Sequence, residues 1–267
     1  MKIHPTALVC KDAQLADDVE VGPHAIIAGR AVLGAGCVVQ ANAVIEGDVV
    51  AGERNLIGYG CVIGGAPQDY AHHGGISSRV RIGSDNRFRE YVTIHRGTGE
   101  GTETVIGDRC FLMVGAHLGH NVQIGNDVII TNNCLLAGHV HVQDAAVLGG
   151  GSVFHQHLRI GSRSMVAGSA KFNKDIPPFT MGAYLNSIIG LNAIGLRRAG
   201  FSPETRREIR RVFQIVMRDG ANITEGVAEA RTSAWGAEAT GFLDFIASSK
   251  RGVATCNSKG GDAMPQG

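Results

Sequence analysis

A large apolar residue recurs at every sixth position through most of this chain. The repeat is unbroken from Ile106 to Phe172, and it also runs from Ile3 to Ile63. Neither a helix nor a hairpin has this period. It suits a prism with a short strand on each flat side and a bend at each corner, in which three sides make a coil of about eighteen residues. The pattern predicts a parallel β-helix, in which each coil buries its apolar side chains against its neighbours.

The fifth position of each six-residue repeat is mostly small, because a bend leaves little interior room. Four of the six cysteines take this position, and no two cysteines form a Cys-x-x-Cys pair. We therefore expect buried, reduced thiols that fill space, and neither disulfides nor metal ligands. The four are Cys37, Cys61, Cys110 and Cys134.

Composition excludes several classes of function. At 267 residues with 44% hydrophobic residues, the chain can bury a large core as one elongated domain with an appendage. The net charge of +1 argues against a nucleic-acid partner. No apolar run is long enough to span a membrane, and Met1 to Pro5 lacks the apolar stretch of a signal peptide. These features predict a soluble, cytoplasmic protein.

Interruptions of the repeat define the expected domain organisation. We expect a β-helix over residues 1–178, with loops at 64–81 and 97–105 where the phase is lost. A loop that leaves such a prism and returns is usually functional. Pro177 and Pro178 should stop the stacking of strands, because proline removes a ladder donor.

The rest of the chain reads as helical. Ser202, Pro203 and Glu204 are typical of a helix start, and Ile209, Val212, Phe213 and Val216 follow at helical spacing. Two more helices are expected at about 224–232 and 237–249. The helical region thus covers residues 179–251, and the small, polar residues 252–267 predict a disordered tail.

Histidines gather on one part of the predicted prism. The repeats that begin at Leu118, Leu136 and Phe154 should lie above one another. They carry five histidines, and three of their residues should align in register, namely His120, Gly138 and Gln156. His117 sits at the bend leading into this face, and His95 lies on the neighbouring face. The five are His120, His139, His141, His155 and His157.

This clustering leaves three roles open. Histidines from stacked coils could bind zinc, as in β-helical carbonic anhydrases. One imidazole could instead act as a general base near neutral pH, as in acyl transfer by many hexapeptide-repeat enzymes. The plainest alternative is a solvated β-face decorated with histidines.

Longer motifs favour one family. Over about residues 1 to 250 the chain resembles the bacterial UDP-N-acetylglucosamine O-acyltransferases that begin lipid A synthesis. The matching segments, in order, are Pro67-Gln68-Asp69, Val92-Thr93-Ile94-His95-Arg96-Gly97-Thr98, Ala116-His117-Leu118-Gly119-His120, Leu136-Ala137-Gly138-His139-Val140, Val153-Phe154-His155-Gln156, Asp175-Ile176-Pro177-Pro178 and Gly195-Leu196-Arg197-Arg198-Ala199-Gly200-Phe201-Ser202.

The resemblance implies a left-handed β-helix, an exception to the usual right-handed crossover, and a homotrimer with active sites between subunits. It makes His120 the general base for the sugar 3-hydroxyl, and the Gly138 amide the oxyanion donor. The donor would be a thioester on the phosphopantetheine of acyl carrier protein, with no metal or other cofactor. Contacts to the nucleotide sugar and the acyl chain would come from Gln68, Asp69, His95, His117, His139, His155 and Gln156, and contacts to uridine and phosphate from Asn192 and Arg198.

Gly168 matches the position that sets acyl length in this family. A glycine there would leave the groove open to a 3-hydroxyacyl chain of about fourteen carbons, each buried methylene adding about 0.8 kcal/mol. The same glycine could simply serve a tight bend. An arginine cluster near the first long helix would either dock the acidic carrier protein or form a solvated helix face. It comprises Arg197, Arg206, Arg207, Arg210 and Arg211.

The chain departs from the family pattern at four places. Asn121 replaces an aspartate after the base, Ala71 replaces a loop lysine, Ile194 replaces a glutamate and Ala199 replaces a second arginine. An acidic partner for His120 is thereby missing from position 121 and a lysine contact is lost from the loop, so the resemblance supports the acyl chemistry more strongly than nucleotide-sugar recognition.

Other functions remain open from the sequence. The N-acyltransferase later in the same pathway has a His-Asn pair like His120-Asn121, but it carries an extra N-terminal domain, whereas the repeats here start at Ile3. A UDP amino sugar is a further candidate substrate. A zinc lyase would use His117, His120 and His139. A noncatalytic scaffold would not need Asp69, His120 and Gly138 together.

Overall fold

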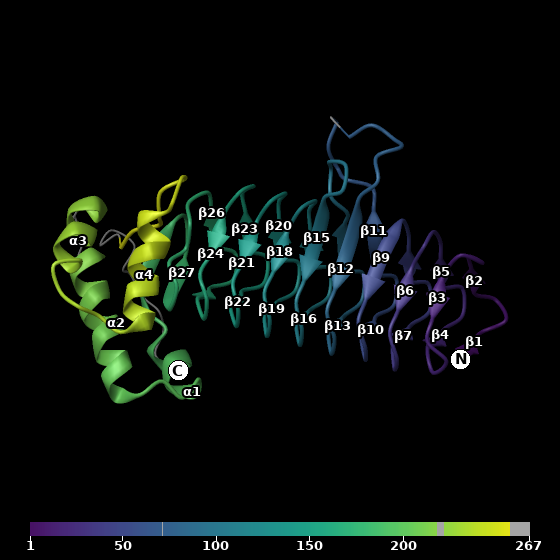
Figure 1. Cartoon of the computed structure of the whole chain (residues 1–267), viewed down its shortest axis with the longest axis horizontal. Helices are drawn as coiled ribbons and strands as arrows, with labels where there is room; N and C mark the ends of the chain where they lie inside the picture. Colours follow the sequence, from purple (N-terminus) through teal and green to yellow (C-terminus); the bar gives the residue numbers. More distant parts are fainter. Residues whose placement is uncertain (71, 218–221, 257–267) are drawn as a thin grey trace.

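The computed structural model describes residues 1–70, 72–217 and 222–256. Short strands stack into three parallel sheets along a β-helix, and helices cover one end (Figure 1). The predicted β-helix with a C-terminal helical region is confirmed. No described helix is both long and apolar enough to cross a bilayer.

Each coil contributes one strand to each sheet. The first sheet contains β1 (Lys2–Ile3), β4 (Glu20–Val21), β7 (Val38–Val39), β10 (Leu56–Ile57), β13 (Arg87–Phe88), β16 (Phe111–Leu112), β19 (Ile129–Ile130), β22 (Val147–Leu148), β25 (Met165–Val166), β27 (Thr180–Ala183) and β28 (Ser187–Leu191). The second contains β2 (Leu8–Val9), β5 (Ile26–Ile27), β8 (Val44–Ile45), β11 (Val62–Gly65), β14 (Thr93–His95), β17 (His117–Leu118), β20 (Leu135–Leu136), β23 (Val153–Phe154) and β26 (Lys171–Phe172). The third contains β3 (Gln14–Leu15), β6 (Val32–Leu33), β9 (Asp48–Ala51), β12 (Arg79–Ile82), β15 (Glu103–Ile106), β18 (Gln123–Ile124), β21 (His141–Val142) and β24 (Arg159–Ile160).

The core is a column of the repeated apolar residues. Leu118 pairs with Leu136, and Leu136 pairs with Phe154, so identical repeat positions stack from coil to coil. The four cysteines at the fifth position are buried, as predicted. Burial raises the pKa of the Cys61 and Cys110 thiols to about 11 and that of Cys134 to about 12, so these thiols stay protonated at neutral pH.

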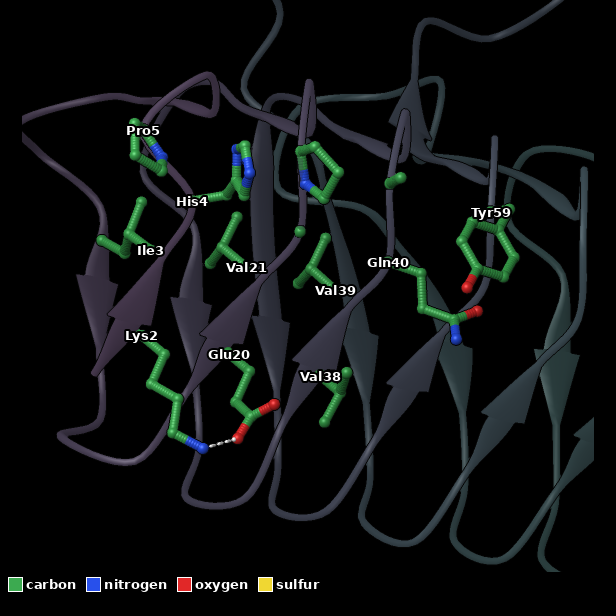
Figure 2. A pocket seen from close by; sticks show the side chains of 13 residues that line it. Lys2, Ile3, His4, Pro5, Glu20, Val21, Val38, Val39, Gln40 and Tyr59 are labelled. Carbon is green, nitrogen blue, oxygen red and sulfur yellow. Dashed lines mark hydrogen bonds and ion pairs between the residues drawn. The ribbon is translucent and has the colours of Figure 1, made fainter.

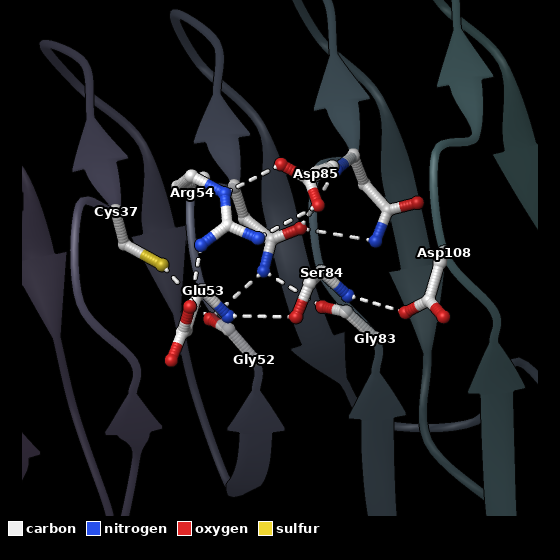
Figure 3. Close-up of polar contacts among 10 residues, drawn as sticks. Cys37, Gly52, Glu53, Arg54, Gly83, Ser84, Asp85 and Asp108 are labelled. Atoms are coloured by element: carbon white, nitrogen blue, oxygen red, sulfur yellow. Dashed lines mark hydrogen bonds and ion pairs between the residues drawn. The ribbon is translucent and has the colours of Figure 1, made fainter.

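Two asparagines replace a small residue at the bend between the third and first sheets, and we call this pair the asparagine ladder. Asn86 is fully buried, and its Nδ2 donates to Asn55 Oδ1 and to Gly107 O, both at 3.0 Å. Asn86 Oδ1 accepts from the Cys110 N–H at 2.8 Å. Around this bend, Glu53 N–H donates to Ser84 Oγ and Ser84 N–H donates to Asp108 Oδ1 (Figure 3). The ladder therefore joins successive coils from the inside.

The first coils are less covered than the rest. Ile3 and Leu8 are exposed. An open groove runs over this end of the first sheet, with the ion pair between Lys2 and Glu20 at its edge (Figure 2). None of the residues expected to take part in chemistry lines this groove. Its lining is mainly apolar and includes Ile3, Pro5, Val21, Pro23, Val38, Val39 and Tyr59.

Two loops leave the β-helix on the same side (Figure 1). The first loop (residues 66–78) follows β11, and the second loop (residues 96–102) follows β14. Both are shorter than the expected 64–81 and 97–105, because β12 and β15 are four-residue strands that pair along their full length. The loops are tied together, since Ser77 N–H donates to Glu100 Oε2 at 3.0 Å and Gly101 N–H donates to Ser77 O at 2.7 Å.

Strand stacking does not stop at Pro177 and Pro178, so that prediction was wrong. β27 joins β25 in parallel just beyond them, and β28 returns antiparallel to β27. Each proline removes its own N–H, while the ladder resumes at Thr180 with ordinary donors.

Four helices lie among the described residues, namely α1 (Ala193–Arg198), α2 (Pro203–Val216), α3 (Ile223–Ala230) and α4 (Ala237–Ala247). The predicted start at Ser202 is confirmed, because its hydroxyl accepts from Thr205 N–H at 3.1 Å. The two later helices are also confirmed. The short helix α1 was not predicted.

Residues 252–256 are ordered against the β-helix, which corrects the expected disorder from Gly252 onward. Val253 and Ala254 are buried, and Val253 and Thr255 bridge to Asp175 and Ser187. Apolar burial and backbone pairing offset the cost of ordering this small segment. Residues 257–267 lie outside the described part of the chain, as does Ala71.

Candidate active site

Histidines from three successive coils meet at the bend between the second and third sheets. We call this group the histidine corner, and it contains His120, His139, His155 and His157. Backbone bonds hold the coils in register, since His139 N–H donates to His120 O at 2.9 Å and His157 N–H donates to Gly138 O at 3.0 Å. The predicted alignment of His120, Gly138 and Gln156 is therefore confirmed.

His141 does not belong to this corner. It lies on β21, where it pairs with Gln123 and Arg159 across the third sheet. The bend ends before the sixth position of the repeat, so His141 lies on a strand of the third sheet. Four of the five expected histidines thus share the corner.

Three imidazole rings of the corner, those of His120, His139 and His157, form a chain of contacts. The His120 and His139 ring centroids are 5.1 Å apart in an edge-on arrangement, and His139 stacks on His157 at 4.5 Å. Burial, followed by the neighbouring His157 and His120, lowers the pKa of His139 below its usual range. The His139 ring that lines the site is therefore neutral at pH 7.

Gly138 lies directly beneath the His120 ring. A Cβ built on Gly138 would be 2.4 Å from His120 Cε1 and 2.5 Å from Nε2, so a side chain there would displace the imidazole. Its N–H donates no hydrogen bond to any other described residue. This amide is thus a spare donor close to His120, as oxyanion stabilisation requires.

The first loop brings a carboxylate to the other side of the imidazole. Asp69 Oδ2 lies 4.0 Å from His120 Nε2, which is too long for a hydrogen bond but close enough for an ion pair with a protonated ring. The His120 side chain is 13% exposed, so its open edge faces this loop. The neighbouring Gln68 is exposed.

His95 and His117 form a second pair on β14 and β17, with ring centroids 5.2 Å apart. His95 Nδ1 donates to Ala66 O at 2.6 Å, which ties this strand to the first loop. His117 Nδ1 lies 2.8 Å from Thr93 Oγ1. Burial and the neighbouring His95 lower the pKa of His117 to about 4, so it is neutral at pH 7.

Sequence reasoning missed three residues that hold the site. Arg251 lies 3.3 Å from His155 Nδ1, Thr98 bonds to Asn121, and buried Thr104 links His95 to Asn121. No local motif signals such contacts, because they join residues between 9 and 96 positions apart.

Three expected site residues lie elsewhere in the chain. Gly168 occupies the bend between the first and second sheets. Asn192 caps α1, with Oδ1 accepting from Gly195 N–H and Nδ2 donating to Arg163 O, both at 3.0 Å. Arg198 is exposed at the end of α1. No contact among the described residues joins these three to the histidine corner.

The geometry does not support the zinc alternative. No group of three histidine, cysteine, aspartate or glutamate side chains is arranged to hold a metal ion in the described ranges. His117 contacts the His95 ring, whereas His139 contacts His120. The three proposed ligands therefore do not converge.

The arginine cluster is less uniform than its sequence indicates. Arg207 pairs with Glu204 at 2.5 Å, and the Arg211 guanidinium lies 5.7 Å from the Trp235 ring. Arg206 is half-buried, while Arg197 and Arg210 are exposed and make no ion pair with another described residue. Only these two are simple surface charges.

Comparison with known proteins assigns the family. Residues 103–138 match the pattern described as bacterial transferase hexapeptide, and residues 175–254 match domain 2 of UDP-N-acetylglucosamine O-acyltransferase. The acyl-[acyl-carrier-protein]–UDP-N-acetylglucosamine O-acyltransferase of Syntrophobacter fumaroxidans is 40% identical, over 95% of this chain and 99% of that protein. The protein of the same name from Thiobacillus denitrificans is 41% identical, over 94% of this chain and 98% of that one. This chain belongs to the UDP-N-acetylglucosamine O-acyltransferase family.

Solved structures agree with this assignment. The UDP-N-acetylglucosamine acyltransferase of Francisella novicida superposes with a TM-score of 0.90 at 31% identity, over 99% of this chain and all of that one. A Bacteroides fragilis UDP-N-acetylglucosamine acyltransferase does so with the same score at 34% identity, over 94% of this chain and 99% of that one. Family membership therefore extends over both the β-helix and the helical region.

Proposed function

We propose that this chain transfers a 3-hydroxyacyl group from acyl carrier protein to the 3-hydroxyl of UDP-N-acetylglucosamine, the first step of lipid A biosynthesis. The observation that carries the chemistry is the arrangement around His120. Its ring lies against Gly138, whose N–H is a spare donor, and its Nε2 lies beside the Asp69 carboxylate. Family membership supplies the substrates.

In this mechanism His120 Nε2 takes the proton of the sugar hydroxyl as the hydroxyl oxygen attacks the thioester carbonyl. The developing oxyanion accepts a hydrogen bond from Gly138 N–H. The C–S bond then breaks, and the imidazolium returns its proton to the departing phosphopantetheine thiolate. Asp69 stabilises the imidazolium in between, because opposite charges 4.0 Å apart attract.

We further propose that the active site lies between subunits of a homotrimer. Gly168, Asn192 and Arg198 lie away from the histidine corner of their own chain, and a neighbouring subunit would bring them to it. Mixing His120→Ala chains with Arg198→Ala chains tests this arrangement. Reassembled mixtures should regain activity if the two residues act from different subunits, whereas a site within one chain would leave every mixture inactive.

The decisive assay is mass spectrometry of the product formed from UDP-N-acetylglucosamine and a panel of acyl carrier protein thioesters. We expect a 3-O-ester that base hydrolyses. A parallel reaction with a UDP 3-amino sugar would give a base-stable amide. Faster amide formation would replace the proposed O-acylation by N-acylation.

A further inference from the structure

The second loop reaches the general base through one amide oxygen. Asn121 Oδ1 lies 3.0 Å from His120 Nδ1, and the same oxygen accepts from Thr98 N–H at 3.1 Å and from Thr98 Oγ1 at 3.0 Å. Three groups from two segments of the chain thus converge on a single acceptor.

These contacts decide which nitrogen of His120 carries the proton. The Thr98 backbone N–H can donate but cannot accept, so the atom that faces it must be the amide oxygen of Asn121 and not its NH₂ group. Because that oxygen can only accept, His120 Nδ1 must donate to it. In the neutral imidazole the lone pair then belongs to Nε2, the nitrogen beside Asp69.

We propose that Thr98 is a positioning residue that, by orienting the Asn121 amide, keeps the proton of His120 on Nδ1 and its lone pair on Nε2. This inference rests on the proposed function, in which Nε2 takes the hydroxyl proton. Both hydrogen bonds from Thr98 go to Asn121 Oδ1, so Thr98 acts on the imidazole through Asn121.

The turn that carries Asn121 is anchored from the preceding coil. Asn121 has φ of 59°, a left-handed conformation that asparagine tolerates better than most residues. Its N–H donates to Thr104 Oγ1 at 2.8 Å, and the buried Thr104 hydroxyl donates to His95 O at 2.7 Å. The backbone is thus fixed independently of Thr98, which leaves Thr98 to set the amide.

An uncharged acceptor has a consequence for pH dependence. The amide oxygen of Asn121 orients the ring without adding a negative charge beside it. A carboxylate at this position would also accept from Nδ1, but it would favour the imidazolium over the neutral base. The Asn121→Asp enzyme should therefore keep the tautomer and lose activity at a higher pH on the acid side.

The first measurement is the tautomer itself, by ¹⁵N NMR of the full-length protein labelled in histidine, with His120→Ala used to assign the His120 signals. We expect Nδ1 protonated and Nε2 unprotonated in the parent. Thr98→Val lacks the hydroxyl but keeps the backbone N–H that faces the Asn121 oxygen, so part of the His120 population should shift to the Nε2-protonated tautomer. Thr98→Ser should restore the parent spectrum.

The second measurement is kinetic and uses a matched control in the same loop. Thr102 Oγ1 bonds within the loop, accepting from Gly99 N–H and donating to Gly99 O, and it does not contact Asn121. Thr98→Val should lower kcat by about threefold to tenfold at unchanged KM, the range expected for one lost hydrogen bond. Thr102→Val should leave the His120 tautomer unchanged.

The possible results distinguish a failure of this inference from a failure of the proposed function. A parent enzyme with Nε2 protonated, or equal tautomer mixing in Thr98→Val and Thr102→Val, would overturn the role of Thr98 while His120 stays the base. An active His120→Ala enzyme would instead overturn the proposed mechanism. Nδ1 protonation that depends on the Thr98 hydroxyl, together with an acid limb moved to higher pH in Asn121→Asp, supports the inference.

Discussion

The asparagine ladder and the histidine corner place polar side chains at different positions of the same six-residue repeat. Asn55 and Asn86 occupy the fifth position, point inward, and bond to backbone atoms of neighbouring coils. His120 occupies the third position, at another bend, and its Nε2 remains open toward the first loop. The repeat position therefore decides whether a polar group holds coils together or meets a substrate.

The two regions also differ in how their polar atoms are satisfied. In the ladder, both amide groups are buried and paired, so removing either side chain leaves unpaired donors or acceptors in the core. At the histidine corner, Gly138 N–H and His120 Nε2 are left for a ligand. Stability and catalysis should thus respond separately to substitutions in the two regions.

The largest expected effect is the loss of turnover in His120→Ala. Removing the general base should lower kcat by about two to four orders of magnitude. The thermal midpoint should stay close to that of the parent, because the ring lies outside the core. Purified protein, circular dichroism and an acyl-transfer assay suffice for this comparison. Activity near the parent level would remove His120 from the mechanism.

Asn86→Ala should show the opposite behaviour. It leaves Gly107 O and Cys110 N–H without their side-chain partner in the core, at a cost of about 1–3 kcal/mol for each buried group that finds no new partner, whereas Asn55 Oδ1 keeps the bond from the Asn86 backbone N–H. The denaturant midpoint should fall clearly, while kcat of the folded enzyme stays unchanged. The exposed Asn132→Ala is the matched control, and equal midpoints for the two variants would show that the ladder contributes nothing to stability.

The sequence predicted the regular parts of both regions, because an unbroken six-residue period determines which residues stack. It did not predict β27 beyond Pro178, since a ladder can restart two residues after a proline. It also overlooked Thr98, because the bond to Asn121 depends on the path of a loop and joins residues 23 positions apart. The winding sense rests on family resemblance, since a six-residue period is the same for either hand.

Gly168 occupies the same third position of the repeat as His120, but at the remaining bend, between the first and second sheets. Its φ is not in the left-handed region and does not require glycine, but a Cβ there would lie 3.1 Å from Gly150 O, so the neighbouring coil must shift slightly to admit a side chain. The Gly168→Met enzyme should stay folded and prefer an acyl chain shorter by several carbons, at about 0.8 kcal/mol per methylene no longer buried. Ranking acyl carrier thioesters by kcat/KM measures the shift. The same ranking in both enzymes would show that Gly168 does not set acyl length.

The smallest expected effect concerns charges that lie on the helices, away from both regions. Arg197 and Arg210 are exposed, whereas other members of the arginine cluster already contact Glu204 or Trp235. If the two dock the acidic carrier protein, Arg197→Glu with Arg210→Glu should raise KM for the carrier several-fold and weaken its salt dependence, since exposed pairs contribute about 0.2–1 kcal/mol each. Lys11→Glu, an exposed charge in the first coils, controls for net charge. The KM for the carrier should rise, while the KM for the nucleotide sugar stays unchanged. A change only in the KM for the nucleotide sugar would show that these arginines act in nucleotide-sugar binding instead.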